Sequence, residues 1–162
     1  CDILLCASSG KATRFEESDV RAMGRSAKGV RGIKLGSGHS LISLIIPAQD
    51  GYLLTASENG FGKRTALDDF PLRGRGAQGV IAMQTSDRNG ALVGAVQIFD
   101  GDELMLISNM GTLVRTKGDE VSLLGRNTQG VRLIKLREEE KLNSVSRIEE
   151  QEDDAAAETT DA

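Results

Sequence analysis

The 162-residue sequence has no tryptophan, one histidine, one tyrosine, two prolines and two cysteines. It contains no run of about 18 apolar residues, so no segment is predicted to cross a membrane. The spacing of Cys1 and Cys6 fits neither a disulfide framework nor a C-x-x-C metal pair. Because no basic segment followed by an apolar one opens the chain, the sequence predicts a cytoplasmic protein with reduced cysteines.

The residue types that carry most catalytic and metal chemistry are scarce and scattered. His39 lies in the segment GSGHS, with no cysteine or second histidine at a ligand spacing, so no metal site is predicted. Tyr52 opens an apolar run and is expected to pack. Adjacent acids such as Glu16 and Glu17 would face opposite sides of a strand. The sequence therefore predicts neither an enzymatic site nor a cofactor within this chain.

Glycine is abundant, at 19 residues, which together with the low proline content indicates many tight turns. Charge is divided unevenly along the chain. Residues 1–137 hold 18 basic and 14 acidic side chains, whereas residues 138–162 hold two basic and ten acidic ones. The last stretch, EEQEDDAAAETTDA at residues 149–162, predicts a disordered acidic tail. This tail would either compete with a polyanion for the basic body or act as a solubilising appendage.

A seven-residue motif occurs three times at nearly constant spacing. It reads GRSAKGV from Gly24, GRGAQGV from Gly74 and GRNTQGV from Gly125, which gives steps of 50 and 51 residues. Upstream of each motif, a glycine is followed four positions later by an arginine, and the same steps hold. The sequence therefore predicts three repeated units, which we place at residues 1–50, 51–101 and 102–148, followed by the tail at 149–162.

Each unit predicts four short β-strands. Apolar runs open each unit (DILLCA, GYLLTA, ELMLIS) and close it, a second strand passes through the shared arginine, and a third begins at the valine after the motif. A four-stranded unit of this length is typical of a propeller blade, and propellers usually have 4–8 blades. The predicted fold is all-β and propeller-like, with three four-stranded blades. Either further blades precede Cys1 or copies of the chain associate, and the absence of an initial methionine favours the first.

The motif is not predicted to bind a nucleotide. It shares the G-x-x-x-x-G spacing of a phosphate-binding loop, but all three copies continue with valine where that loop needs lysine and then serine or threonine. Its glycines instead predict turns between the second and third strands, with positive φ or close backbone approach. Turn formation alone does not explain the recurring arginine.

Basic residues recur around every motif and predict a cationic stripe along the stacked blades, suited to the phosphates of a nucleic acid. The five aromatic residues are too few and too scattered for a platform that stacks single-stranded bases, so duplex DNA is the predicted ligand. The alternative is a solvated surface with local ion pairs, such as Arg14 with Glu16 or Asp19. The predicted DNA-binding residues are Arg14, Arg25, Lys28, Arg31, Lys63, Arg64, Arg73, Arg75, Arg115, Lys117, Arg126 and Arg132.

Several segments resemble the later blades of the C-terminal domain of DNA gyrase A. They include GVRGIKL, TASENGFGKRTALDDFP and LLGRNTQGVRLIKL, and the resemblance runs from Asp2 to Ile148. It implies a six-bladed β-pinwheel in which a strand is exchanged between blades and duplex DNA wraps on a basic rim, supporting negative supercoiling. The other partners implied are the rest of gyrase A and the protein gyrase B, with no membrane.

Three departures limit what the resemblance implies. The glycine-rich box of the family's first blade has no counterpart, and three blades are visible where the family has six. The catalytic tyrosine and the ATPase, with its ATP and Mg²⁺, belong to parts outside this chain. The alternatives are a protein-binding propeller scaffold and the C-terminal domain of the A-type subunit of topoisomerase IV.

Overall fold

The computed structural model describes residues 1–149, so the predicted acidic tail, apart from Glu149, lies outside the described residues. The described part consists of β-strands and three single-turn 3-10 helices, which confirms the all-β prediction. No helix within residues 1–149 is long and apolar enough to cross a bilayer.

Each unit is built on the same antiparallel arrangement, in which an apolar central strand lies between two neighbours. In unit 1 these strands are β1 (Asp2–Ala7), flanked by β2 (Lys11–Glu16) and β3 (Leu41–Ile45). In unit 2 they are β4 (Tyr52–Ser57), flanked by β5 (Phe61–Ala66) and β7 (Leu92–Ile98). In unit 3 they are β8 (Glu103–Ser108), flanked by β9 (Leu113–Lys117) and β11 (Leu142–Ile148).

A 3-10 helix follows the second strand of every unit at the same place. The three helices are η1 (Glu17–Asp19), η2 (Leu67–Asp69) and η3 (Gly118–Glu120). Each ends where the chain becomes extended again, because the residue after it returns to the β region. After η2 and η3 the chain leaves its own sheet and runs along the second strand of the preceding unit, where Leu72 bridges to Arg14 and Leu123 to Arg64.

The fourth strand of a complete sheet comes from the following unit. Strand β6 (Val80–Ile81) of unit 2 pairs with β2 of unit 1, and β10 (Val131–Arg132) of unit 3 pairs with β5 of unit 2. The sheet orders are therefore β3-β1-β2-β6, β10-β5-β4-β7 and β11-β8-β9. This arrangement confirms the strand exchange that the resemblance implies.

Unit 3 departs from the prediction of four strands in every blade, since its sheet has three strands within residues 1–149. The segment that begins at Val30 in unit 1 also forms no strand, although its counterparts at Val80 and Val131 do. Both differences have one physical cause. A third strand pairs with the sheet of the preceding unit, and within residues 1–149 no sheet precedes unit 1 and no unit follows unit 3.

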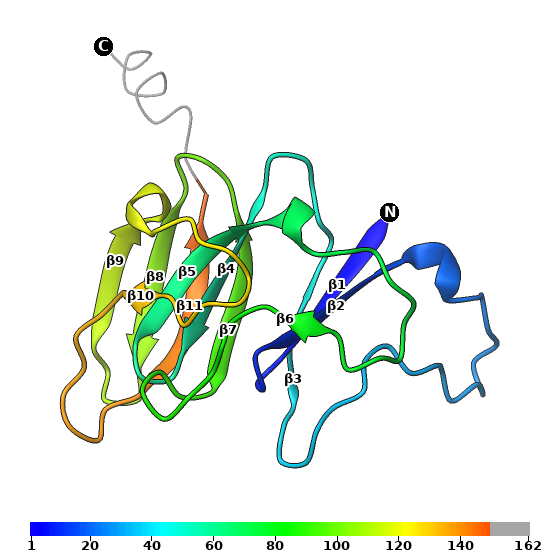
Figure 1. Ribbon diagram of the computed structural model, residues 1–162, viewed down its shortest axis with the longest axis horizontal. Coiled ribbons are helices and arrows are strands. Elements are labelled where there is room, and N and C mark those ends of the chain that lie inside the picture. The colour runs from blue at the N-terminus through cyan, green and yellow to red at the C-terminus, as the bar shows by residue number, and fades with distance from the viewer. Residues whose placement is uncertain (150–162) are drawn as a thin grey trace, which may run out of the picture.

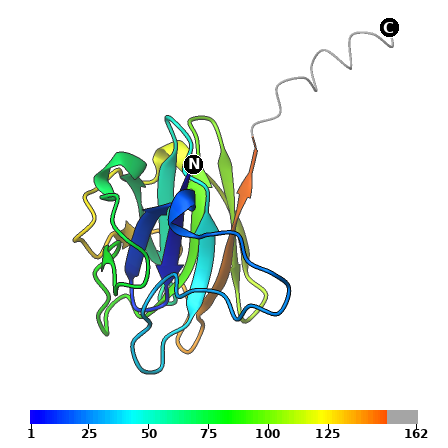
Figure 2. The same cartoon turned by 90° about the vertical axis from the view of Figure 1, so that its right-hand side faces the viewer.

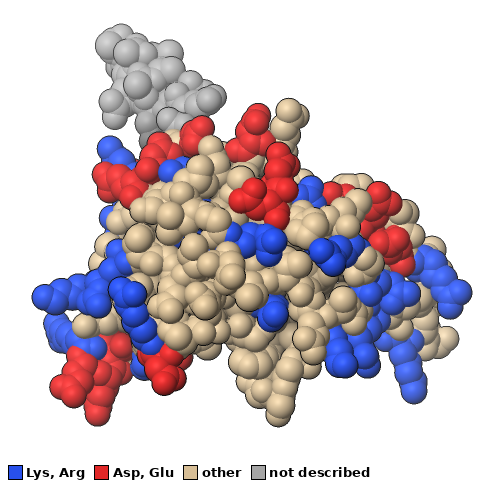
Figure 3. All heavy atoms as spheres, viewed as in Figure 1, with Lys and Arg blue, Asp and Glu red and all other residues tan. Residues whose placement is uncertain are grey.

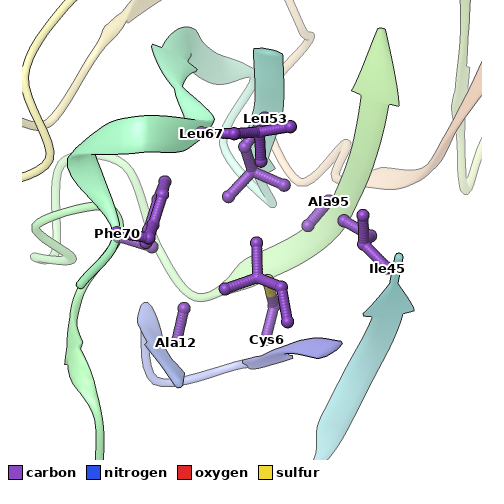
Figure 4. Packing of buried hydrophobic residues seen from close by; sticks show 9 residues of the cluster. Cys6, Ala12, Ile45, Leu53, Leu67, Phe70 and Ala95 are labelled. Atoms are coloured by element: carbon purple, nitrogen blue, oxygen red, sulfur yellow. The ribbon is translucent and has the colours of Figure 1, made fainter. Parts of the chain in front are cut away.

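The sheets stack side by side, as Figures 1 and 2 show, and the hydrophobic core lies in the two layers between them. The first layer packs Leu4, Cys6 and Ile45 of unit 1 against Leu53, Phe70 and Ala95 of unit 2, several of which are labelled in Figure 4. The second packs Leu54, Ala56 and Ile98 of unit 2 against Leu104, Leu106 and Val145 of unit 3.

Leu53 and Leu54 are adjacent in β4, yet they fill different layers, because successive side chains of a strand point to opposite faces. The central sheet is therefore apolar on both faces, and each of its faces is covered only by a neighbouring unit. Folding of each unit consequently depends on the units beside it, as in other repeat proteins.

Candidate nucleic-acid interface

The motif glycines form the predicted turns. The second glycine of each motif has positive φ, at 83° for Gly29, 89° for Gly79 and 80° for Gly130, a conformation that favours glycine. Close approach matters as well, since a Cβ on Gly79 would collide with the carbonyl oxygen of Ala12, and one on Gly130 would lie 2.6 Å from that of Gly62. These glycines let the motif loop lie against the backbone of the preceding unit.

Two of the motif arginines hold adjacent units together. Arg75 donates from Nε to the carbonyl oxygen of Asp19 at 3.1 Å, and Arg126 donates from Nε to that of Asp69 at 2.8 Å. Both carbonyls belong to the last residue of a 3-10 helix in the preceding unit. The motif arginine therefore satisfies a backbone oxygen left free at a helix end, which explains why packing requires a guanidinium there.

The arginines upstream of the motifs have a related structural role. Arg14 donates from Nη1 to the carbonyl oxygen of Leu67 at 2.8 Å and forms an ion pair with Asp2. Arg64 donates from Nε to the carbonyl oxygen of Val121 at 2.8 Å and lies over the ring of Tyr52. The side chain of Arg14 is only 18 % exposed, so most of its guanidinium is occupied by protein contacts.

Lys63 differs from its prediction as a DNA-contacting residue. It is 0 % exposed, and its ammonium donates to the carbonyl oxygens of Gly125 and Arg126 at 2.6 and 2.5 Å and to Oγ1 of Thr128 at 2.8 Å. Burial, and secondarily the positive charge of Arg126, lowers the pKa of Lys63 from 10.5 to about 8. With all three protons donated inside the protein, Lys63 has no surface with which to contact a phosphate, and it fixes the third motif loop instead.

A second group of predicted cations is exposed. Five of them form no side-chain hydrogen bond or ion pair within residues 1–149, namely Arg25, Lys28, Arg31, Arg73 and Lys117. Arg115 pairs with Glu103 but keeps its side chain 61 % exposed. Arg132 is exposed and lies with its guanidinium 5.3 Å from the ring centre of Phe61.

Positive and negative side chains separate on the surface drawn in Figure 3. Lysine and arginine gather at the right-hand end, over the loops that follow β2 and η1, and a further group lies at the left. Acidic side chains lie mainly along the upper margin and at the lower left. The loops that carry the first motif therefore present a concentrated positive charge to solvent.

Among the exposed cations outside the predicted set, Arg88 lies beside a predicted one. Arg88 lies with its guanidinium 4.9 Å from the ring centre of Phe61, the same ring that Arg132 approaches. Phe61 is 3 % exposed, so its buried ring supports two surface arginines. Arg88 stands in the turn TSDRNGA of unit 2, which has no basic counterpart in the other units, so a search based on repetition could not find it.

The residue types that could take part in catalysis or bind a metal have ordinary surroundings. His39 contacts Oγ of Ser8 through Nδ1 at 3.2 Å and is exposed, and Tyr52 packs at the second core layer. Both cysteines are free, and burial raises the pKa of Cys6 to about 12. No group of three metal-ligating side chains is close enough to hold an ion in the part of the chain that the structure describes.

Stacked β-blades linked by exchanged strands, with basic loops between them, define a repeat domain of the propeller class. The sequence matches the family described as "DNA gyrase C-terminal domain, beta-propeller" over residues 2–48, 51–98 and 102–149. The chain belongs to this family.

Similar curated relatives are DNA gyrase A proteins of bacteria. The protein of Pseudomonas aeruginosa is 61 % identical over 149 residues, which is 92 % of this chain and 16 % of the relative. Those of Salmonella typhimurium and Escherichia coli are 49 % and 48 % identical over 160 residues, which is 99 % of this chain and 18 % of each relative. The chain therefore spans less than a fifth of the length of these relatives.

Solved structures show the same fold. "Structure of DNA gyrase A C-terminal domain" superposes with a TM-score of 0.82 at 30 % identity, covering 91 % of this chain and 50 % of that one. "Crystal structure of the C-terminal domain of DNA topoisomerase IV" superposes with a TM-score of 0.85 at 24 % identity, covering 99 % of this chain and 52 % of that one. The second likeness concerns the fold alone.

Proposed function

We propose that this chain is a non-catalytic module of DNA gyrase A that binds and wraps duplex DNA. The observation that carries the proposal is the set of exposed cations that have no protein partner within residues 1–149, three of which, Arg25, Lys28 and Arg31, lie at the first motif loop. Unpaired lysine and arginine side chains are suited to phosphates, because neutralising each phosphate releases condensed counterions. Membership of the gyrase C-terminal domain family supports the same conclusion.

The stacking of units gives a physical reason for wrapping. Each unit presents the same type of loop beside its neighbour, so a duplex that touches successive loops would follow the line of the stack. Favourable phosphate interactions along such a path would offset the elastic cost of bending, of order 1–6 kcal/mol for a site of 20–30 base pairs. Recognition would depend on backbone charge and shape, with little dependence on base sequence.

The chemistry of supercoiling would lie outside this chain. We infer that the catalytic tyrosine, the ATPase and its Mg²⁺ belong to other parts of gyrase, including gyrase B, and that this chain needs no cofactor. The protein would act in the bacterial cytoplasm, at the nucleoid. Its contribution to ATP-dependent negative supercoiling would be the handedness of the DNA path.

The first test measures the affinity for a fluorescent duplex as a function of salt concentration. Arg75 and Arg126 hold units together, so the informative variants change exposed cations without protein partners. The double variant Lys28→Gln with Arg31→Gln should reduce the slope of log K against log salt by about 1.8, if each side chain neutralises one phosphate. Affinity for all duplex sequences should fall by a similar factor.

A matched control removes the same charge elsewhere. Lys135 and Arg137 are exposed, precede β11 and stand outside the predicted set. The double variant Lys135→Gln with Arg137→Gln should leave the slope within about 0.5 of the unchanged protein, since a site effect needs a local phosphate contact. Equal reductions of the slope in both double variants would mean that only net charge matters. Absence of duplex binding at low salt would contradict the proposal.

DNA wrapping is tested by a separate measurement. A nicked plasmid sealed in the presence of the chain should show a change in linking number that grows with protein concentration, because a handed path fixes writhe before sealing. The double variant Lys28→Gln with Arg31→Gln should show a smaller change at equal protein. Binding with an unchanged linking number would refute wrapping and retain simple duplex binding.

The remaining alternatives have weaker support. The gyrase relatives at 48–61 % identity favour gyrase over topoisomerase IV, whose solved domain shares the fold at 24 % identity. If the chain were a protein-binding scaffold, the duplex would not bind at low salt. The first test therefore distinguishes this alternative from DNA binding.

A further inference from the structure

One buried aromatic ring lies under two arginines that come from different units. Phe61 is the first residue of β5 in unit 2, and Arg132 lies directly opposite it in β10 of unit 3 (Figure 1). The guanidinium carbon of Arg132 is 5.3 Å from the ring centre, and that of Arg88, in the turn before β7, is 4.9 Å from it. The two guanidinium carbons are therefore no more than 10.2 Å apart, the sum of these distances. Both arginines stand at the contact between units 2 and 3, and we call such contacts between consecutive units junctions.

The turn that carries Arg88 is held in place by hydrogen bonds from both units. Asn89 is fully buried, and its side-chain amide donates to the carbonyl oxygens of Gln84 at 2.8 Å and Gln129 at 3.3 Å. Gln129 belongs to the motif loop of unit 3. In unit 2, Nδ2 of Asn59 donates to the carbonyl oxygen of Arg88 itself at 3.0 Å. The junction therefore fixes the backbone from which the side chain of Arg88 extends.

Neither guanidinium group is neutralised by an acid within residues 1–149. Arg88 and Arg132 are both exposed, and the contact with the ring is the side-chain interaction that each of them makes in this range. Asp87 is the neighbour of Arg88 in the sequence, yet no ion pair joins these two described side chains. Arg14 differs, because its guanidinium pairs with Asp2. Both arginines over the ring therefore keep their charge and their donors available to an anion from outside.

An aromatic ring can position a guanidinium group without cancelling its charge. The quadrupole of the ring attracts a cation placed over its face. A long side chain that is already held in place loses less conformational freedom when it binds a ligand, which favours binding. The planar fork of donors in arginine matches the oxygen atoms of a phosphate. Two arginines held over one ring therefore form a preorganised site for phosphate groups.

We propose that Arg88 and Arg132 bind neighbouring phosphates of one strand of duplex DNA, and that Phe61 positions both arginines. Successive phosphates of a strand are separated by about 3.4 Å along the helix axis, so two guanidinium groups this close together reach the same stretch of backbone. The inference rests on the proposed function. It adds to the predicted DNA-binding residues a fixed contact at the junction of units 2 and 3, of which Arg88 supplies half.

The first test measures the affinity of the chain for a fluorescent duplex over a range of salt concentrations. Arg88→Gln and Arg132→Gln should each reduce the slope of log K against log salt by about 0.9, and the double variant by about 1.8, since each side chain neutralises one phosphate. Arg137→Gln is the matched control, because Arg137 is exposed in the turn before β11 and stands outside the proposed site. It should leave the slope within about 0.3 of that of the unchanged chain.

The role of Phe61 is tested by a variant that keeps the net charge. Phe61→Leu retains an apolar side chain but removes the aromatic face, so the affinity for the duplex at fixed salt should fall at least about threefold. In the double variant Arg88→Gln with Arg132→Gln, the same change should have no effect on affinity, because no guanidinium is left for the ring to position. An equal loss in both backgrounds would show that Phe61 supports only the fold, and would refute its positioning role.

Chemical modification of the unchanged chain gives a second measurement. Phenylglyoxal reacts with exposed arginine side chains, and mass spectrometry reports the extent of reaction at each position. A saturating duplex should slow the reaction at Arg88 and Arg132, whereas Arg137 should react at the same rate with and without DNA. Equal protection of all three arginines, or no protection of Arg88, would overturn the proposed site.

The results distinguish failure of this site from failure of the proposed function. If the unchanged chain binds no duplex at low salt, both are wrong. If it binds, and the double variant Lys28→Gln with Arg31→Gln reduces the slope while Arg88→Gln does not, the proposed function stands and the site over Phe61 is refuted. Equal reductions by Arg88→Gln and Arg137→Gln would also refute the site, because the slope would then depend on net charge alone.

Discussion

Arg126 and Asp69 stand 57 positions apart in the sequence, yet Nε of Arg126 donates a hydrogen bond of 2.8 Å to the carbonyl oxygen of Asp69. The same relationship joins Arg75 to Asp19 across the preceding junction. A second bond runs from Nη1 of Arg126 to the carbonyl oxygen of Ile81 at 3.0 Å. The repeated arginine thus connects the 3-10 helix and the exchanged strand of one unit with the motif loop of the next.

Replacing Arg126 by alanine should destabilise the junction between units 2 and 3. Loss of a charged donor to two carbonyls, discounted for partial exposure, should lower the free energy of unfolding by about 1–2 kcal/mol. Urea unfolding followed by circular dichroism measures the change. Arg73→Ala is the control, because Arg73 is exposed without a side-chain partner in residues 1–149, and it should stay within about 0.5 kcal/mol. Equal effects would contradict the structural role of Arg126.

The two glycines of the third motif should respond differently to alanine. Gly130 has φ 80° and a Cβ there would lie 2.6 Å from the carbonyl oxygen of Gly62, whereas nothing lies within 4 Å of the Cβ position on Gly125. Gly130→Ala should therefore cost at least about 2 kcal/mol, and Gly125→Ala should change stability by less than about 1 kcal/mol. Thermal unfolding of the two variants side by side measures the difference. A similar loss for both would show that the close approach does not matter.

The sequence allowed the repeat, the short strands and the glycine turns to be predicted, because each depends on local chemistry that recurs every 50 or 51 residues. The sheet to which Val80 and Val131 belong could not be derived from that pattern. Strand pairing depends on where the 3-10 helix sends the chain, and hydrophobic alternation is the same whether a strand joins its own sheet or the neighbouring one.

The candidate site was harder to predict than the fold. Lys63 and Lys28 both lie near a motif or a turn, yet Lys63 is buried by the motif loop of the next unit and Lys28 is exposed. Exposure depends on the neighbouring unit, which sequence spacing does not reveal. Arg88 was missed for a different reason, since it stands in the turn before the last strand of unit 2, whose sequence TSDRNGA is not repeated in the other units.

Lys63 should contribute to stability despite the cost of burying its charge. Lys63→Met removes the donor to the carbonyls of Gly125 and Arg126 and to Thr128, so the free energy of unfolding should fall by about 2–4 kcal/mol. Amide hydrogens from Thr128 to Val131 should also exchange faster, because the loop loses its internal anchor. Lys11→Met is the control at a half-buried lysine on β2, and it should leave exchange in this loop unchanged. Unchanged exchange in Lys63→Met would refute the anchoring role.

Glu140 should make the third unit sensitive to acid. Its carboxylate accepts hydrogen bonds from the backbone N–H of Arg137 at 3.0 Å and from the hydroxyls of Ser108 and Thr112 at 2.5 and 2.6 Å, and these bonds lower the pKa of Glu140 from 4.5 to about 2. The folded state therefore holds this proton more weakly than the unfolded state. The stabilisation is complete above about pH 4.5 and is lost as the pH falls toward 2.

Stability measured in urea at a series of pH values tests this assignment. The unchanged protein should lose stability more steeply between pH 4.5 and 2 than Glu140→Gln, and the two curves should converge at the acid end of this range. Glu138→Gln removes the same charge from an exposed position in the same turn, so its curve should run parallel to that of the unchanged protein. If the stability curve of Glu140→Gln also ran parallel to that of the unchanged protein, the hydrogen bonds of Glu140 would not favour its ionised form. Only a difference in proton binding between the folded and unfolded states produces a difference in slope.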